Sequence, residues 1–187
     1  MKTGSGSKQK GSALERQIAK TLSLWVTGGK REDCYWRSSM SGGRATIQRR
    51  KGVSNKTQTG DITAIDPVGA WLTDRFIIEA KFYKDLDIES GIISNTGRLH
   101  KFWIDLVDIG HTINKWPMLV AKENNRPILL VLSSKGETAL RLDPQTALAI
   151  LPLWNNARIY LFSDLLQTEC MAAHNAEIPI ASYSSPR

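Results

Sequence analysis

The sequence has few cysteines, few histidines and no long apolar run. Cys34 and Cys170 are far apart and form no CxxC pair, which argues against a zinc ribbon, an iron–sulfur cluster or a disulfide framework. The three histidines show no metal-ligand spacing. No apolar run reaches the roughly 20 residues of a membrane span, and residues 1–7 lack the apolar segment of a secretory signal. We therefore expect a cytoplasmic protein with no membrane partner.

Acidic residues are scarce in the first 58 residues, which contain 13 Lys and Arg against 3 Asp and Glu. The whole chain carries +7, so the remainder carries −3. Such a distribution favours a polyanionic partner, most simply nucleic acid; the alternative is a disordered basic arm that serves solubility. The length of 187 residues fits one domain. We expect a disordered tail over 1–11, a single domain over 12–173 with its core ending near residue 132, and a tail over 174–187.

A short apolar run at Phe76–Ile78 is followed by residues that do not belong in a core. The run predicts a buried strand. Side chains alternate along a strand, so Glu79 and Lys81 emerge on one face and Ala80 on the other. Burying these charges is costly unless they are paired or bind something. The alternative is a surface ion pair on an edge strand.

A second alternating run at 61–66 carries Asp61 and ends in the turn residues of 66–69. We expect the two runs to pair as a hairpin with a loop over 68–74, which brings Asp61 near Glu79. Two carboxylates and the Ala80 carbonyl make an all-oxygen site suited to Mg²⁺. Lys81 would orient a metal-bound water or stabilise charge on a phosphate.

Upstream, Ser12 and Glu15 form a capping box that begins a helix reaching about Thr27. Glu15 borders the apolar face of that helix, so it serves either the cap alone or, aimed inward, the metal site. After it, Ser41 lies in a Gly-rich loop whose backbone N–H groups could approach phosphate. Further along the chain, after Lys81, Lys84 is a further candidate to bind a DNA phosphate.

The segment from 44 to 56 is basic and contains no acid. We interpret it as a flap that closes on the DNA backbone; the alternative is a solvated loop. Its basic residues are Arg44, Arg49, Arg50, Lys51 and Lys56.

The remaining patterns predict an α/β fold with a central mixed β-sheet flanked by helices. A helix at 96–114 joins the strand of Glu79 to a parallel strand at 118–122 as a crossover, and a strand at 128–132 runs antiparallel to the latter. The other expected elements are a short strand at 33–37, a connector at 82–93, a helix at 143–154, a strand at 158–162 and a helix at 163–173.

In this order, the helix with Glu15, the basic loop and the Asp61 and Glu79 strands resemble the PD-(D/E)xK nuclease superfamily. Within it, the chain looks most like archaeal-type Holliday junction resolvases and their phage-encoded relatives. The resemblance covers about residues 10–132. The matching residues are Lys10-Gly11 with Glu15-Arg16, Arg37 with Ser41-Gly42, Gly60-Asp61-Ile62, Ile78-Glu79-Ala80-Lys81, Lys101-Phe102 and Pro117–Ala121.

The resemblance implies a restriction-endonuclease-like core in the order α-β-β-β-α-β-β. It implies that Asp61, Glu79 and the Ala80 carbonyl hold Mg²⁺, with Mn²⁺ as a substitute, and that Glu15 completes the acidic site. Lys81 would position the attacking water, and Arg37 and Ser41 would engage the scissile phosphate. Lys10 and Arg16 would join the DNA-binding residues.

The same resemblance implies a homodimer associated with the nucleoid. Its two sites would nick opposed strands of a four-way DNA junction in recombination and repair. Three departures bear on this: Gly60 replaces the family's proline, the segment between Ser41 and Asp61 is longer, and the chain past about residue 132 is extra. Two alternatives stay open. One is a restriction-like or repair nuclease for linear duplex DNA, and the other is a non-catalytic DNA-binding protein with this fold.

Overall fold

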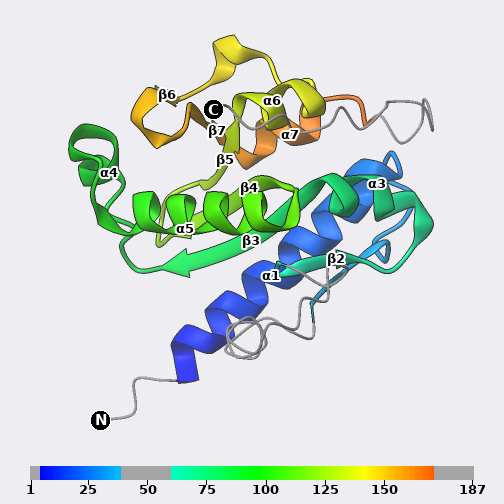
Figure 1. Ribbon diagram of the computed structural model, residues 1–187. Helices are drawn as coiled ribbons and strands as arrows, with labels where there is room; N and C mark the ends of the chain where they lie inside the picture. Colours follow the sequence, from blue (N-terminus) through cyan, green and yellow to red (C-terminus); the bar gives the residue numbers. More distant parts are fainter. Residues whose placement is uncertain (1–4, 39–59, 171–187) are drawn as a thin grey trace.

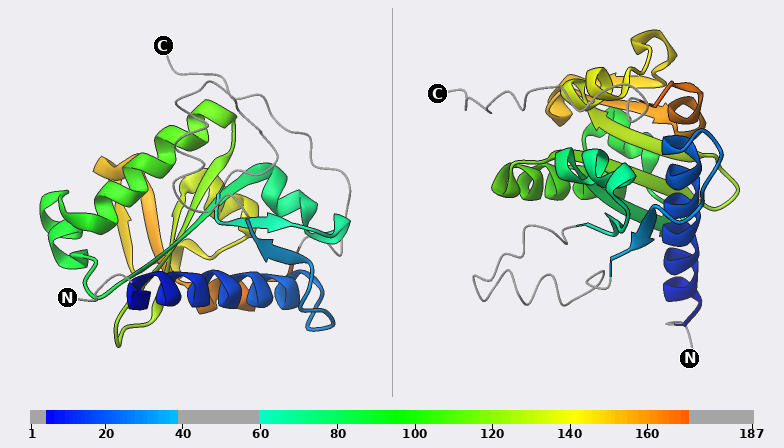
Figure 2. Two further views of the ribbon diagram at one scale, coloured as in Figure 1. Left: turned by 90° about the horizontal axis from the view of Figure 1, so that it is seen from below. Right: turned by 90° about the vertical axis from the view of Figure 1, so that its right-hand side faces the viewer.

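The computed structural model describes residues 5–38 and 60–170. It has a five-stranded mixed sheet in the order β3-β4-β5-β7-β6 and a separate two-stranded ribbon, β1-β2 (Figure 1). Helices α1 and α5 lie on opposite faces of the sheet (Figure 2). The predicted fold class, α/β with a mixed sheet flanked by helices, is confirmed.

The elements, in chain order, are α1 (Ser5–Val26), β1 (Tyr35–Arg37), β2 (Ile62–Ala64), α3 (Pro67–Arg75), β3 (Phe76–Tyr83), α4 (Ile88–Ser94), α5 (Gly97–Ile113), β4 (Trp116–Glu123), β5 (Ile128–Ser133), α6 (Ser134–Leu140), η1 (Pro144–Thr146), β6 (Ala149–Leu151), η2 (Pro152–Trp154), β7 (Ala157–Leu161) and α7 (Phe162–Gln167).

The centre of the fold is the β3-α5-β4 unit. Strands β3 and β4 are parallel and β4 and β5 antiparallel, as predicted. Helix α5 ends at Asn114, which adopts a left-handed conformation (φ 57°) and donates its N–H back to the last turn. Strand β4 begins at Trp116, two residues before the predicted start at 118, and Trp116 and Pro117 pair with Phe76 and Ile77.

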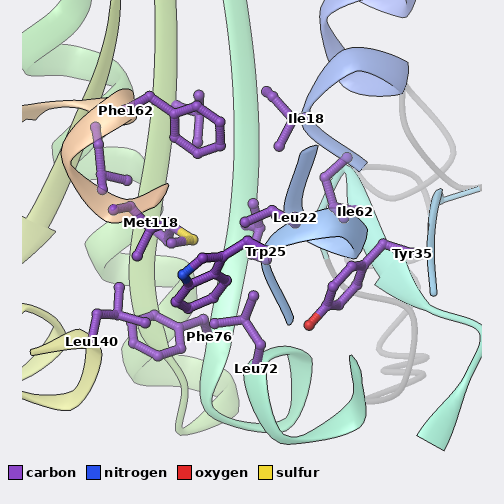
Figure 3. Packing of buried hydrophobic residues seen from close by; sticks show 14 of the residues in the cluster. Ile18, Leu22, Trp25, Tyr35, Ile62, Leu72, Phe76, Met118, Leu140 and Phe162 are labelled. Carbon is purple, nitrogen blue, oxygen red and sulfur yellow. The ribbon is translucent and has the colours of Figure 1, made fainter. Parts of the chain in front are cut away.

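Strand β3 is buried on both faces, which explains its continuous apolar start. Phe76, Ile78 and Ala80 belong to the core cluster shared with α1, part of which is shown in Figure 3. Ile77 belongs to the second cluster, packed with α5. Because the faces alternate, Glu79 and Lys81 follow Ile77 onto the α5 face.

Two expectations near the N-terminus are wrong. The helix begins at Ser5, not at Ser12, so residues 5–11 are not a disordered tail. The added length has a tertiary contact, since the Lys10 ammonium donates to Asn124 Oδ1 at 3.3 Å and lies 5.5 Å from the Phe82 ring centroid. Ser12 is therefore inside the helix and does not cap it.

The expected hairpin between the Asp61 and Glu79 runs is also wrong. Helix α3 occupies the interval, and β2 pairs with β1 instead. The Asp66-Pro67 pair that predicted a turn is the start of this helix: the Asp66 carboxylate accepts the Val68 N–H at 2.9 Å, and Pro67 takes the first helical turn.

The C-terminal third differs most from prediction. Residues 143–154 form η1, β6 and η2 rather than one helix, because Pro152 has no N–H to continue a helix and residues 149–151 pair with β7. The strand predicted at 158–162 is β7. The last helix, α7, ends at Gln167, and its N-cap backbone at Leu161 is held by the Asp164 carboxylate. The connector at 82–93 holds the end of β3 and most of α4.

Candidate active site

Asp61 is fixed against the outer edge of β3, the edge strand of the sheet. Its N–H donates to the Ile78 carbonyl at 2.8 Å. Its carboxylate accepts the Ala80 N–H at 2.9 Å. The chain before β2 thus contacts β3 without forming a hairpin, and it places Asp61 beside the strand that carries Glu79.

Gly60 allows this close approach. It has φ +99°, and a Cβ added to it would lie 2.7 Å from the Ile78 carbonyl oxygen. Both the backbone angle and the lack of space require glycine. The sequence marks Gly60 only as the residue in place of the family's proline and does not show that it sets the position of Asp61.

The Ala80 carbonyl faces the same edge as Asp61. In a β-strand the N–H and C=O of one residue point to the same neighbour, and the Ala80 N–H points to Asp61. The Ala80 oxygen is therefore directed to the outer edge of β3 rather than to β4. This edge offers a carboxylate and a carbonyl oxygen next to each other.

Glu79 and Lys81 form an ion pair on the α5 face, and each side chain is 24% exposed. The Lys81 ammonium also lies 5.6 Å from the Phe102 ring centroid. Burial lowers the pKa of Lys81, but the carboxylates of Glu79 and Asp61 outweigh that effect and raise it overall. Lys81 is thus a fixed cation between two acidic groups.

The Asp61 carboxyl is buried, with 7% of the residue exposed. Its burial, reinforced by the charge of Glu79, raises its pKa to about 7; Lys81 and the Ala80 N–H oppose the rise, and Glu15 adds to it. The anionic form is therefore under-compensated by the protein. A divalent cation would relieve this repulsion, and carboxylate and carbonyl oxygens are the ligands that Mg²⁺ prefers, so the donor set fits the ion.

Glu15 and Arg37 adjoin this site from α1 and β1. Arg37 Nε lies 2.7 Å from Glu15 Oε2. The Ser38 N–H, next to Arg37, donates to the Asp61 carbonyl at 2.8 Å. The charge of Glu15 contributes to the raised pKa of Asp61, and the Glu15 carboxylate is held by Arg37. In the described part of the chain, no three acidic, histidine or cysteine side chains converge closely enough to hold a metal ion.

The predicted DNA-binding residues are only partly described. Lys10 contacts Asn124 and Phe82 as above, and Arg16 and Lys84 are exposed. The others, together with Ser41, lie outside the described residues: Arg44, Arg49, Arg50, Lys51 and Lys56.

A second buried carboxylate, Glu137 on α6, was not singled out by the sequence. It is 5% exposed and accepts the Tyr160 hydroxyl at 2.5 Å. Arg158 Nε lies 2.5 Å from the same oxygen, although its N–H is not aligned for a hydrogen bond. Burial and the bond to Glu137 raise the pKa of Tyr160.

The α/β fold, a five-stranded mixed sheet flanked by helices, is consistent with the restriction-endonuclease-like fold of the PD-(D/E)xK class. Residues 6–157 match the family described as "Phage putative PDDEXK endonuclease", and the chain belongs to this family. Comparisons with curated proteins and with solved structures gave no match. PDDEXK nucleases generally require a divalent metal and act on DNA. Across the described residues, no helix combines the length and apolarity needed to span a membrane.

Proposed function

We propose that the protein is a Mg²⁺-dependent, structure-selective endodeoxyribonuclease. The observation that supports it best is the buried Asp61 carboxylate, which accepts the Ala80 N–H beside the Glu79–Lys81 pair. A protein that only binds DNA has no use for carboxylates near phosphate, because they repel it. The acidic cluster therefore favours cleavage over binding alone.

We propose the following role for each residue, and the geometry of the site supports these roles. Asp61, Glu79 and the Ala80 carbonyl would hold Mg²⁺, or Mn²⁺ in its place. When bound, the ion would lower the pKa of a water and offset charge on the phosphate. The Lys81 ammonium orients the attacking oxygen and stabilises the negative charge that develops on the phosphate. Arg37, with Ser41, contacts the scissile phosphate, and Glu15 holds the guanidinium of Arg37 at the edge of the site.

For the substrate we propose a four-way junction, cut by a homodimer with paired symmetric nicks during recombination or repair beside the nucleoid. The order of the Glu15, Asp61 and Glu79 motifs supports this. The basic segment from 44 to 56 would bind the DNA backbone with Lys10, Arg16 and Lys84. A restriction-like or repair nuclease for linear duplex is the second candidate, because the long segment between Ser41 and Asp61 and the elements after residue 132 depart from the resolvase pattern.

The test is cleavage of an immobile four-way junction and of a linear duplex with matching arms, in Mg²⁺ or EDTA, with Asp61→Asn as control. The proposal expects paired nicks on the junction alone, lost in EDTA and in the variant. Equal cutting of both substrates would instead support the second candidate, a nuclease for linear duplex DNA. Tight binding without cutting of either substrate would leave a non-catalytic DNA-binding protein.

A further inference from the structure

Trp36 is unusual among the tryptophans because its ring is exposed to solvent. All six tryptophans lie in the described part of the chain. Trp103 and Trp154 are fully buried, and Trp25, Trp71 and Trp116 are buried or half-buried. Trp36 is 58% exposed. A large aromatic side chain left in water on a rigid strand does not stabilise the core.

The β1-β2 ribbon fixes the direction of this side chain. Tyr35 is 1% exposed and faces the core, and the side chain of Arg37 reaches Glu15 on α1. By alternation Trp36 points to the outer face. Its cross-strand partner there is Thr63, and Ile65, two residues on, is 61% exposed.

This outer face adjoins the candidate active site. Arg37 pairs with Ile62, the residue after Asp61, and the Ser38 N–H bonds to the Asp61 carbonyl. Ordinary strand spacings place the Cα atoms of Trp36 and Asp61 about 8–9 Å apart. A group stacked on the indole would therefore lie within about one to two nucleotides of a phosphate at the acidic site.

We propose that Trp36 stacks on an unpaired or unstacked base at the branch point of DNA, and so positions branched substrates at the site. This inference rests on the proposed function and specifies how its substrate is recognised. A base stacked on an aromatic side chain contributes severalfold to about a hundredfold in affinity and tolerates any sequence. In continuous duplex the bases are stacked on each other, so the indole would gain nothing.

The charge of the sequence that follows β1 favours nucleic acid over a protein partner. The chain between Ser38 and Gly60 contains five basic residues and no acidic one, and it leaves and re-enters the described structure at the end of the ribbon next to Asp61. The outer face itself presents one aromatic ring and one aliphatic side chain. That is a small area for a stable protein interface but sufficient for one base.

The experiment measures binding of the full-length chain in EDTA to a four-way junction and to the matched duplex, each with 2-aminopurine at the branch position. Trp36→Ala should weaken junction binding about 5- to 100-fold, with less than a twofold change on duplex. It should also abolish the change in 2-aminopurine fluorescence on binding. Because stacking releases no counterions, the salt dependence of binding should stay as in the wild type.

Two variants serve as matched controls. Trp36→Phe keeps an aromatic face and should retain most of the junction affinity. Ile65→Ala removes an exposed apolar side chain from the same face and should bind like the wild type. Circular dichroism of each variant checks folding.

Three results would overturn the proposal: equal loss of junction and duplex binding in Trp36→Ala, an equal loss in Ile65→Ala, or a change in the association state of the free Trp36→Ala protein by sedimentation. The last would make the surface a protein contact. Since binding is measured without metal, failure of stacking leaves cleavage by the wild type intact. Conversely, if the wild type cuts no DNA but Trp36→Ala weakens junction binding, only the proposed nuclease activity is refuted.

Discussion

Asp61 and Glu137 are both buried carboxylates, yet their surroundings are opposite. Glu137 has Arg158 and the Tyr160 hydroxyl on one oxygen. The Asp61 carboxylate accepts one backbone N–H, and its burial and the charges of Glu79 and Glu15 outweigh Lys81 and raise its pKa to about 7. A buried charge supplied with a cation and a donor is part of the fold. A buried charge that the fold leaves under-compensated is typical of a functional site.

We expect the largest difference between the two carboxylates in the rate of DNA cleavage. Asp61→Asn should lower the rate of DNA cleavage at least about 1,000-fold, because it removes a proposed metal ligand and charge at the phosphate. Glu137→Gln, at the other carboxylate, should cleave within a few-fold of the wild type. Single-turnover kinetics on labelled DNA in Mg²⁺ compare the two. Comparable losses would remove the distinction between the sites.

The second prediction is that Asp61, and not Glu137, makes the free energy of unfolding depend on pH. In EDTA, unfolded Asp61 releases its proton near pH 3.9, whereas the folded group holds it up to about 7. Between these values the folded state binds more protons, so the free energy of unfolding falls as pH rises. The titration of Asp61 alone should lower the free energy of unfolding by about 4 kcal/mol between these two pH values. Urea titrations from pH 4 to 7.5 should show the fall in wild type and Glu137→Gln but not in Asp61→Asn. Parallel curves for wild type and Asp61→Asn would contradict it.

The two partner cations should also behave oppositely. Arg158→Ala leaves Glu137 buried without its cation and should lower the free energy of unfolding by about 3 kcal/mol, with cleavage by the folded fraction retained. Lys81→Ala should lose cleavage about 100-fold while changing stability by less than about 1 kcal/mol, because its ion pair is partly exposed. Denaturation and cleavage of both variants test the pair. Intact cleavage by Lys81→Ala would remove Lys81 from the mechanism.

The smallest expected effect is stabilisation by the ion. At a Mg²⁺ concentration 100 times its dissociation constant, binding to the native state adds about 2.7 kcal/mol, which raises the melting temperature by roughly 5–10 °C for a chain of this size. Wild type and Glu137→Gln should show the rise, and Asp61→Asn should not. A uniform rise in all three proteins would place the ion elsewhere.

The sequence predicted the central elements because their signals are local. The apolar run before Glu79, the amphipathic helix after it and the next two strands are each visible in short windows, and β3, α5, β4 and β5 follow them. Alternation along a strand also placed Glu79 and Lys81 on one face. Because both side chains lie on that face, they form an ion pair and Lys81 lies over the Phe102 ring of α5.

The parts that the sequence could not predict depend on tertiary contacts. The Asp66-Pro67 pair serves equally well as a turn or as a helix start, and only packing selects α3. The first turns of α1 include Lys10, which contacts residues more than 70 positions away, Phe82 and Asn124. In the C-terminal third, β6 forms by pairing with β7, while its own residues predict a helix. The burial of Glu137 requires Tyr160 and Arg158, which no spacing rule connects to it.

The geometry at Gly60 has a consequence for protein engineering. The resemblance to PD-(D/E)xK nucleases implies a proline before the aspartate, so a design guided by that motif would replace Gly60 with proline. Proline holds φ near −65°, whereas this position requires +99° and has no room for a Cβ. Restoring the family residue would therefore move Asp61 off β3 and harm the site that the motif defines. In this chain the more typical motif would fit the backbone less well than glycine does.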